Sequence, residues 1–178
     1  MRPTALLNFG KGKSQMVSER TGSKKEAMRK KALGELGELV ALKTLVDNGF
    51  EKISHLNDTK RRNYPFADLL AEKEGKKYAI SVKARNKFQK NDTLNNRYNL
   101  KQTHVAKVEK ELLAEAYWMA IPFDKNSYSV RFGAVVELKD ASGRPLSGIP
   151  MGENCSYGVE LVKDKLHYFD FSFFTNQN

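Results

Sequence analysis

The chain has 178 residues, with 31 Lys and Arg against 21 Asp and Glu and a formal charge of +10. This length suits a single domain with a real core, and one cysteine, Cys155, excludes a disulfide framework or a multi-cysteine zinc site. No apolar run approaches the roughly 20 residues of a membrane-spanning helix, and the first ten residues do not read as a signal peptide. We therefore expect a cytoplasmic protein without a membrane partner, whose positive charge points to nucleic acid.

The basic charge is concentrated in two separated segments. Residues 1–31 contain nine Lys and Arg against two acidic residues, and residues 83–110 contain eight against two. Residues 32–82 contain eight of each sign, whereas residues 111–178 contain six basic and nine acidic residues. Such clustering favours a phosphate-contacting surface, although a solvated helix face and a basic tail would give the same composition.

The beginning of the chain is predicted to be mobile. Residues 1–22 show no sustained periodicity and are rich in Gly, Lys and Ser. We expect them to form a flexible basic segment ahead of a single domain at residues 23–178. Its core is expected at residues 24–138, with a loop and strand extension at residues 139–178.

A helix is predicted after this segment. Ser23 and Glu26 have the spacing of a capping box, and Asn48-Gly49 is a helix stop. Gly34 and Gly37 lie inside the helix, where each costs about 1 kcal/mol relative to alanine. Their presence indicates that another backbone or a ligand comes close to this helix.

The remaining elements indicate a mixed α/β sheet with flanking helices. A second helix is predicted at residues 100–114 from the period of its apolar positions, and Trp118 is expected in the core. Polar or Gly-rich and Pro-rich loops are expected at residues 57–65, 86–99 and 139–158. Alternating or apolar runs predict strands at residues 50–56, 66–73, 77–84, 117–123, 128–138 and 167–174.

Two charged residues stand in strands that otherwise read as buried. Asp68 follows Pro65-Phe66-Ala67, and Lys83 lies in Ile80-Ser81-Val82-Lys83-Ala84-Arg85. A buried charge costs several kcal/mol unless it is paired or bound to a metal. Ser81 and Lys83 project from the same face of their strand, and a hairpin of the two strands would bring Asp68 close to that face.

This pattern resembles the PD-(D/E)xK nuclease superfamily, which includes many restriction enzymes and archaeal Holliday-junction resolvases. The resemblance covers residues 24–123, and residues 34–85 support it best. Family members often carry a Gly-Glu pair on the first helix, followed eleven residues later by the glycine of a Gly-aromatic pair. Gly37-Glu38 and Gly49-Phe50 have that spacing. The resemblance implies a restriction-endonuclease-like fold with an αβββαβ core, with Asp68 as the metal-binding aspartate and Lys83 as the catalytic lysine.

The chain departs from the family at one position. Ser81 stands where the family usually has Glu, Asp or Gln, and serine is a poor neutral metal ligand. Either Glu38 supplies the missing carboxylate, with Glu35 as its rival, or the site is weakened or inactive. Because no histidine has an evident partner that would place it beside Ser81, we expect the serine to hydrogen-bond within the site rather than act as a nucleophile.

The resemblance implies hydrolysis of phosphodiester bonds in double-stranded or branched DNA with Mg²⁺ or Mn²⁺. Asp68, Glu38 and the carbonyl of Val82 would hold the metal, and Lys83 would orient water or stabilise the phosphate. A homodimer would supply the two sites that two strand breaks need. The lone cysteine agrees with this set of ligands, because oxygen donors favour Mg²⁺ over zinc.

Several basic residues are candidates for nucleic-acid contacts. Those flanking the predicted site in sequence, or on one side of the second helix, are Lys60, Arg61, Arg62, Arg85, Lys87, Lys101 and Lys107, with His104 beside the last two. The alternative to an endonuclease is a nuclease-like binding protein that has lost catalysis, which Ser81 favours. Binding to an anionic membrane surface is a third alternative, but the chain lacks a convincing basic amphipathic helix.

Overall fold

The computed structural model describes residues 12–60 and 62–165. Its helices are α1 Gly12–Asp47, α2 Leu56–Thr59 and α3 Val105–Leu112, with 3₁₀ turns η1 Gln102–His104 and η2 Val135–Glu137. Its strands are β1 Glu51–His55, β2 Leu69–Lys73, β3 Lys76–Asn86, β4 Tyr98–Asn99, β5 Glu115–Phe123, β6 Ser127–Ala134, β7 Gly148–Ile149 and β8 Val159–Lys165. None of the helices in these ranges is long and apolar enough to span a membrane.

Six strands form one mixed sheet in the order β1-β2-β3-β5-β6-β8, and β4 pairs with β7 in a small separate ribbon. Strands β3 and β5 are parallel, while the other neighbours in the large sheet are antiparallel. The parallel pair requires a crossover, and the chain makes it through β4, η1 and α3. The prediction of a mixed α/β protein is therefore confirmed.

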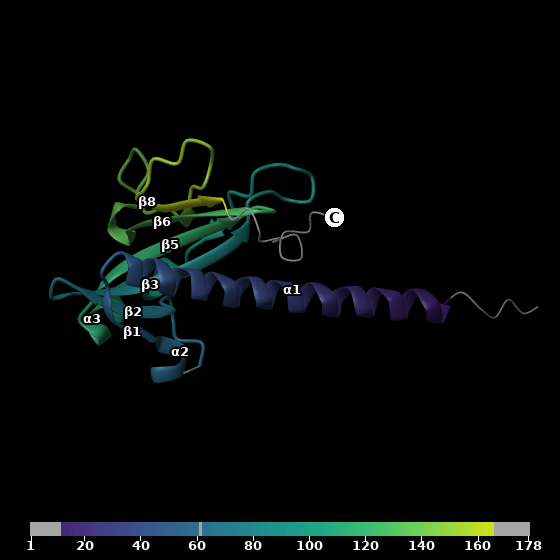
Figure 1. The fold of residues 1–178 in the computed structure, drawn as a ribbon, viewed down its shortest axis with the longest axis horizontal. Helices are drawn as coiled ribbons and strands as arrows, with labels where there is room; N and C mark the ends of the chain where they lie inside the picture. The colour runs from purple at the N-terminus through teal and green to yellow at the C-terminus, as the bar shows by residue number, and fades with distance from the viewer. Residues whose placement is uncertain (1–11, 61, 166–178) are drawn as a thin grey trace, which may run out of the picture.

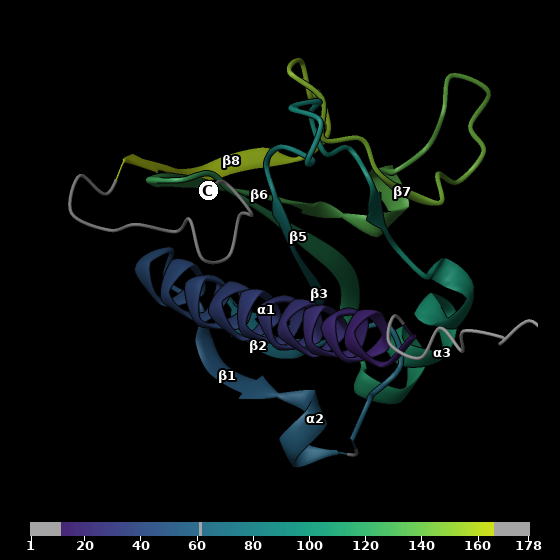
Figure 2. The same cartoon turned by 90° about the vertical axis from the view of Figure 1, so that its right-hand side faces the viewer.

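Helix α1 lies across one face of the sheet and continues past its edge (Figures 1 and 2). The strand period of two divides the core between the faces: Ile80, Val82 and Ala84 belong to the same cluster as Leu33 and Leu45 of α1. The helix ends at Asp47, and Gly49 supplies the left-handed φ of +76° that turns the chain toward β1. The predicted helix stop is thus confirmed.

The opposite face of the sheet is covered by α3, η2 and the long connections. Trp118 is fully buried there and packs with Tyr98 and Leu138, as expected for a core residue. Val108 and Leu112 of α3 form a neighbouring cluster under the start of β3. Between these two clusters, Ser81 and Lys83 line a cleft.

Gly37 marks the closest approach of α1 to the sheet. A Cβ at this position would overlap the Cβ of Ala84 on β3 and would lie 3.6 Å from the Ala84 Cα. A Cβ at Gly34 would meet nothing within 4 Å, although Gly34 lines the cleft described below. The expected close approach of a backbone is therefore confirmed for Gly37, and Gly34 stands beside open space.

The start of the first helix was predicted wrongly. Helix α1 begins at Gly12, so Ser23 lies inside it and cannot act as the N-cap. Residues 12–22 are helical rather than irregular, and only residues 1–11 of the expected mobile segment lie outside the described residues. Lys, Arg, Gln, Glu and Met are good helix formers without apolar periodicity, which is why the segment gave no amphipathic signal.

Other expectations for strands and loops also differ from the structure or lie outside it. The strand predicted at residues 128–138 ends at Ala134, and the 3₁₀ turn η2 follows it. The loops predicted at residues 57–65, 86–99 and 139–158 contain α2, β4 and β7, because short polar elements carry little periodic signal. Strand β8 was missed, and the strand predicted at residues 167–174 lies outside the described residues.

Candidate metal centre and its cleft

Asp68 lies immediately before β2, and its backbone is held from two sides. Its N–H donates to the carbonyl of Ile80 on β3 at 2.8 Å, and its carbonyl accepts from the N–H of Leu56 at 2.9 Å. Its carboxylate Oδ2 accepts a hydrogen bond from the backbone N–H of Val82 at 2.7 Å. The β2–β3 hairpin therefore fixes both the backbone and the side chain of this aspartate.

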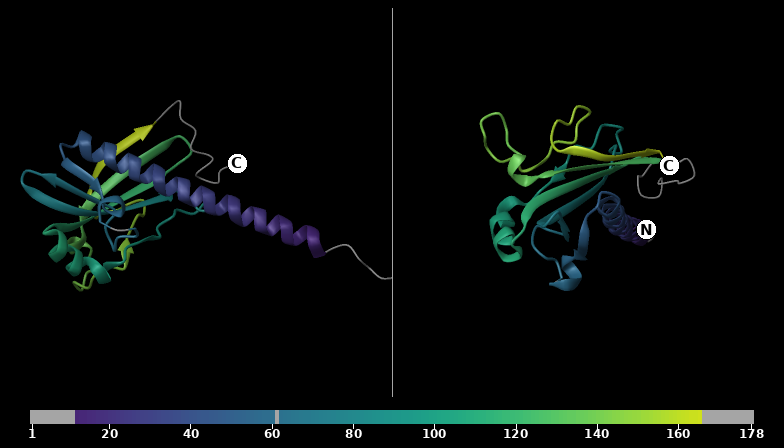
Figure 3. Two further views of the ribbon diagram at one scale, coloured as in Figure 1. Left: turned by 90° about the horizontal axis from the view of Figure 1, so that it is seen from below. Right: turned by 60° about the vertical axis from the view of Figure 1, so that its left-hand side comes forward.

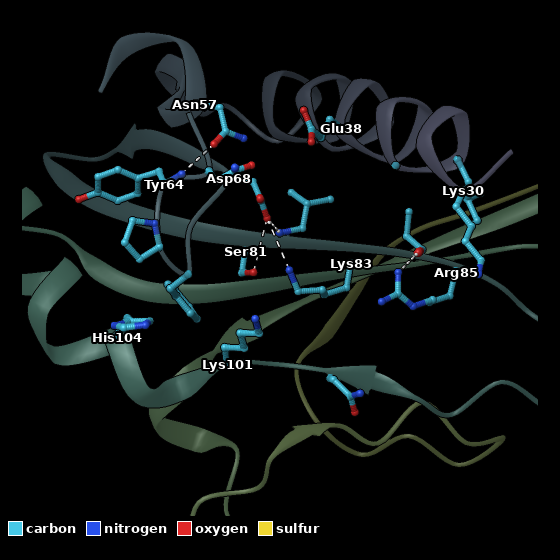
Figure 4. Close-up of a pocket in the computed structure, with 18 of the residues that line it drawn as sticks. Lys30, Glu38, Asn57, Tyr64, Asp68, Ser81, Lys83, Arg85, Lys101 and His104 are labelled. Atoms are coloured by element: carbon cyan, nitrogen blue, oxygen red, sulfur yellow. Dashed lines mark hydrogen bonds and ion pairs between the residues drawn. The ribbon is translucent and has the colours of Figure 1, made fainter. Parts of the chain in front are cut away.

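Ser81 and Lys83 approach the same carboxylate from β3. Lys83 Nζ lies 3.7 Å from Asp68 Oδ2, and the Ser81 hydroxyl donates to Oδ2 at 3.5 Å. Ser81 is only 1% exposed, whereas the Lys83 side chain is 23% exposed. The predicted hairpin, the shared face and the proximity of Asp68 are all present (Figure 4).

The pKa of the Asp68 carboxyl is raised above its usual value because burial disfavours the charged form. The charge of Lys83 and the hydrogen bond from Val82 oppose this effect without cancelling it. A partly buried aspartate that gains incomplete compensation from its protein neighbours is a favourable place for a further positive charge.

Glu38 brings a second carboxylate to the same cleft from α1. Figure 4 shows its side chain on the α1 side of the cleft, across from Asp68, and both residues line the cleft. Burial raises the pKa of Glu38, and the charge of Asp68 raises it further. His55 Nδ1 lies 3.5 Å from Glu38 Oε2, so this histidine contacts the site. Glu35 is exposed, pairs with Lys31 at 3.6 Å and does not line the cleft.

The carbonyl of Val82 also faces the aspartate side of β3. The carbonyl of Ile80 points toward β2, where it accepts from Asp68, and the N–H of Val82 points the same way. Within one strand residue the N–H and the C=O point to the same side, so the Val82 carbonyl also points toward the β2 side of β3. The pairing of β2 with β3 starts at Leu69 and Ile80, so Val82 lies beyond the paired part of β2. This places a neutral oxygen donor on the same side of β3 as the Asp68 carboxylate.

These donors suit a hard divalent cation. Two carboxylates and a carbonyl are the oxygen ligands that Mg²⁺ accepts, with water completing its shell. The mutual repulsion of Asp68 and Glu38, visible in the raised pKa of Glu38, is what a cation between them would relieve. Across residues 12–60 and 62–165 no three His, Cys, Asp or Glu side chains form a metal-binding group, so the ion would depend on the Val82 carbonyl and water.

The site opens into a cleft of about 1090 Å³ between α1 and the segment before α3. Amide side chains line much of it: Asn57, Asn63, Asn86, Asn95 and Asn99. Besides Lys83, the basic side chains that line it are Arg29, Lys30, Arg85, Lys101 and His104. The cleft therefore combines two acidic groups on its wall with several positive groups and neutral hydrogen-bonding groups around them.

The structure brings together some of the predicted nucleic-acid contacts. Arg85 and Lys101 line the cleft, as does His104. Lys87 lines a neighbouring pocket, where it lies 3.5 Å from Asp124. The others do not line the cleft: Lys60, Arg62 and Lys107 are exposed elsewhere, and Arg61 lies outside the described residues.

Arg29 and Lys30 were missed in the sequence, although a signal for Lys30 was present. Lys30, Gly34 and Glu38 are spaced by four residues, which places them on one line of a helix. Arg29 is buried and donates two hydrogen bonds to Glu26, at 2.7 and 3.1 Å. These bonds lower the pKa of the Glu26 carboxyl to about 2.

Comparisons with known proteins add no relative: no protein-family model, curated protein or solved structure matches the chain. We therefore infer the function from the residues of the site and from their geometry.

Proposed function

We propose that the protein is a divalent-metal-dependent endonuclease that hydrolyses phosphodiester bonds in DNA, with a restriction-endonuclease-like core of the PD-(D/E)xK type. The observation that carries this proposal is the meeting of Asp68, Glu38 and Lys83 in one cleft with basic groups around it. The order of α1, three antiparallel strands, α3 and the parallel strand β5 supports the αβββαβ core.

Asp68, Glu38 and the Val82 carbonyl would hold Mg²⁺ or Mn²⁺. When bound, the ion would supply a Lewis acid for the phosphate and lower the pKa of a coordinated water. Asp68 is held by the N–H of Val82 through one oxygen, Oδ2, and its other oxygen accepts no hydrogen bond from the residues that the structure describes. Fixing the carboxylate in this way reduces the entropy that metal binding would otherwise cost.

Lys83 would act on the substrate as well as on Asp68. Its separation of 3.7 Å from Asp68 Oδ2 is well beyond the roughly 2.7–2.9 Å of a strong charge-assisted hydrogen bond. The ammonium is partly exposed in the cleft, so a phosphate oxygen or an attacking water can accept from it. Removing such a charge-stabilising donor typically costs about 10²–10³ in rate.

Ser81 supports a second candidate function, the binding of nucleic acid without hydrolysis. Its buried hydroxyl gives a neutral donor where a third acidic ligand would otherwise stand. In that case Lys83 would serve as the ion-pair partner of Asp68, and the basic cleft would bind phosphates through charge alone.

A cleavage assay separates the two functions. Supercoiled, linear and branched DNA are incubated with Mg²⁺, Mn²⁺ or a chelator, using the wild type, Asp68→Asn, Glu38→Gln and Lys83→Met. We expect metal-dependent cleavage by the wild type and a loss of about 10²–10³ in Lys83→Met. The control Glu35→Gln removes a carboxylate from the same helix outside the cleft and should cleave like the wild type.

Two other results would contradict the proposed endonuclease site. A wild type that cleaves none of these DNAs in either metal, yet binds them in a salt-dependent way, would contradict the endonuclease and establish the binding protein. Cleavage that persists unchanged in Asp68→Asn would show that the activity arises elsewhere.

A further inference from the structure

Helix α1 is much longer than the sheet that it covers. It contains 36 residues, and its first buried side chain among those described is Arg29. The stretch from Gly12 to residue 28 spans about 25 Å at 1.5 Å per residue, and Figures 1 and 3 show this part running beyond the sheet. Residues 24–28 place no buried side chain in the sheet core, so the extension of the helix needs another explanation.

Two exposed lysines on this helix line up with Glu38. Lys31 and Lys24 precede Glu38 by seven and fourteen residues, and seven residues make nearly two turns of an α-helix. They therefore lie on almost the same line of the helix, about 10 and 21 Å from Glu38 along its axis. Lys25 lies about 140° around the helix from Glu38 by the same geometry, on the side away from this line.

The two lysines keep their charge available. Both are exposed, and Lys24 forms no ion pair with any side chain that the structure describes. Lys31 lies 3.6 Å from Glu35, and both side chains are mostly solvent-exposed, so this surface pair is weak and easily exchanged. A phosphate can replace the carboxylate at little cost.

The line continues the basic groups of the cleft. Lys30, the neighbour of Lys31 in the helix, lines the cleft. Figure 4 shows Lys30 and Arg85 at the same end of the cleft, where α1 extends away from it. A polyanion that leaves the cleft at this end would therefore meet Lys31 first and then Lys24.

We propose that the line Lys24–Lys31 of α1 is a phosphate-binding arm, and that the substrate is duplex DNA extending along it beyond one side of the cleaved bond. The proposal rests on the proposed function and adds the required shape of the substrate. Phosphates of one strand are about 3.4 Å apart along B-DNA, so the 21 Å from Glu38 to Lys24 corresponds to about six base pairs. Lysines contact phosphates as point charges without reading the sequence.

The test is a binding measurement with duplexes of two lengths in a chelator, where no cleavage occurs. Fluorescence anisotropy compares duplexes of about 8 and about 24 base pairs, using the full chain and the double variant Lys24→Gln/Lys31→Gln. We expect the double variant to bind the long duplex about tenfold more weakly. The short duplex, centred on the cleft, reaches Lys31 but not Lys24 and should lose less affinity. The slope of log affinity against log salt on the long duplex should fall by about 1.8, two phosphate contacts.

Lys25→Gln is the matched control for the single variant Lys24→Gln, because each removes one positive charge and Lys25 lies on the other side of the same helix. It should bind the long duplex like the wild type. Equal losses in Lys25→Gln and Lys24→Gln, equal losses on both duplex lengths, or equal affinity for single strands of the same length would each overturn the arm. A wild type that binds no duplex would instead overturn the proposed function itself.

Discussion

Replacing Gly37 with alanine tests how closely α1 must approach the sheet for the site to form. The added Cβ would overlap the Cβ of Ala84, which is attached directly to the β3 backbone and cannot rotate away. Carbon atoms pack best about 3.5–4.0 Å apart, so the helix has to move outward or tilt. Glu38 follows Gly37 in sequence and would move with the helix, away from Asp68.

The stability cost of the overlap with Ala84 can be isolated with a second substitution in the same helix. Gly34→Ala and Gly37→Ala gain the same helix propensity, about 1 kcal/mol each, but an alanine Cβ at Gly34 meets nothing within 4 Å. Overpacking costs about 1–3 kcal/mol. Gly37→Ala should therefore be less stable than Gly34→Ala by about 1–3 kcal/mol, although both carry the same chemical change.

Urea denaturation of the two variants and the wild type measures this difference directly. In a thermal melt each kcal/mol should appear as about 2–4 °C for a chain of this size. Metal affinity should fall in Gly37→Ala because Glu38 has moved. Equal stability of the two alanine variants would refute the argument that the backbone of β3 dictates this glycine.

Three further outcomes are expected. In metal-free buffer at neutral pH, Asp68→Asn should raise the free energy of unfolding, because burial disfavours the charged form of this carboxyl; urea denaturation checks this, and a less stable variant contradicts it. The pKa of Glu26 is lowered to about 2 by Arg29, so its contribution to stability is present above the ordinary carboxyl pKa and is lost as the pH falls toward 2. Glu26→Gln should abolish that part of the pH dependence in thermal melts, and an unchanged profile contradicts the assignment. Gly158→Ala should destabilise the fold by more than about 1 kcal/mol, because φ is +62° and the new Cβ would press on the Phe132 carbonyl and Trp118; a melting temperature like that of the wild type argues against it.

The sequence predicted the inner part of the site because strand periodicity is local. Ser81 and Lys83 share a face through a spacing of two residues, and only one hairpin was needed to add Asp68. The close approach at Gly37 was predicted for a related reason. A glycine inside a helix costs stability, so its presence indicates a packing contact even when the contacting residue is distant in sequence.

The outer part of the site depends on long-range placement, which no local pattern encodes. Lys60, Arg62 and Lys107 lie near the site in sequence or on a promising helix face, yet they do not line the cleft. Arg29 and Lys30 are far from Asp68 in sequence and reach the cleft only because α1 crosses the sheet beside it. Sequence proximity was therefore a poor guide to which cations surround the carboxylates.

A calorimetric titration with Mn²⁺, without nucleic acid, tests the central claim most directly. We expect the wild type and Glu35→Gln to bind the ion alike, and Asp68→Asn and Glu38→Gln each to lose most of the affinity. At 100 times the dissociation constant the bound ion should also stabilise the fold by about 2.7 kcal/mol. Metal binding that survives unchanged in both Asp68→Asn and Glu38→Gln, or a wild type that binds no divalent ion, would contradict the metal centre formed by α1 and the β2–β3 hairpin.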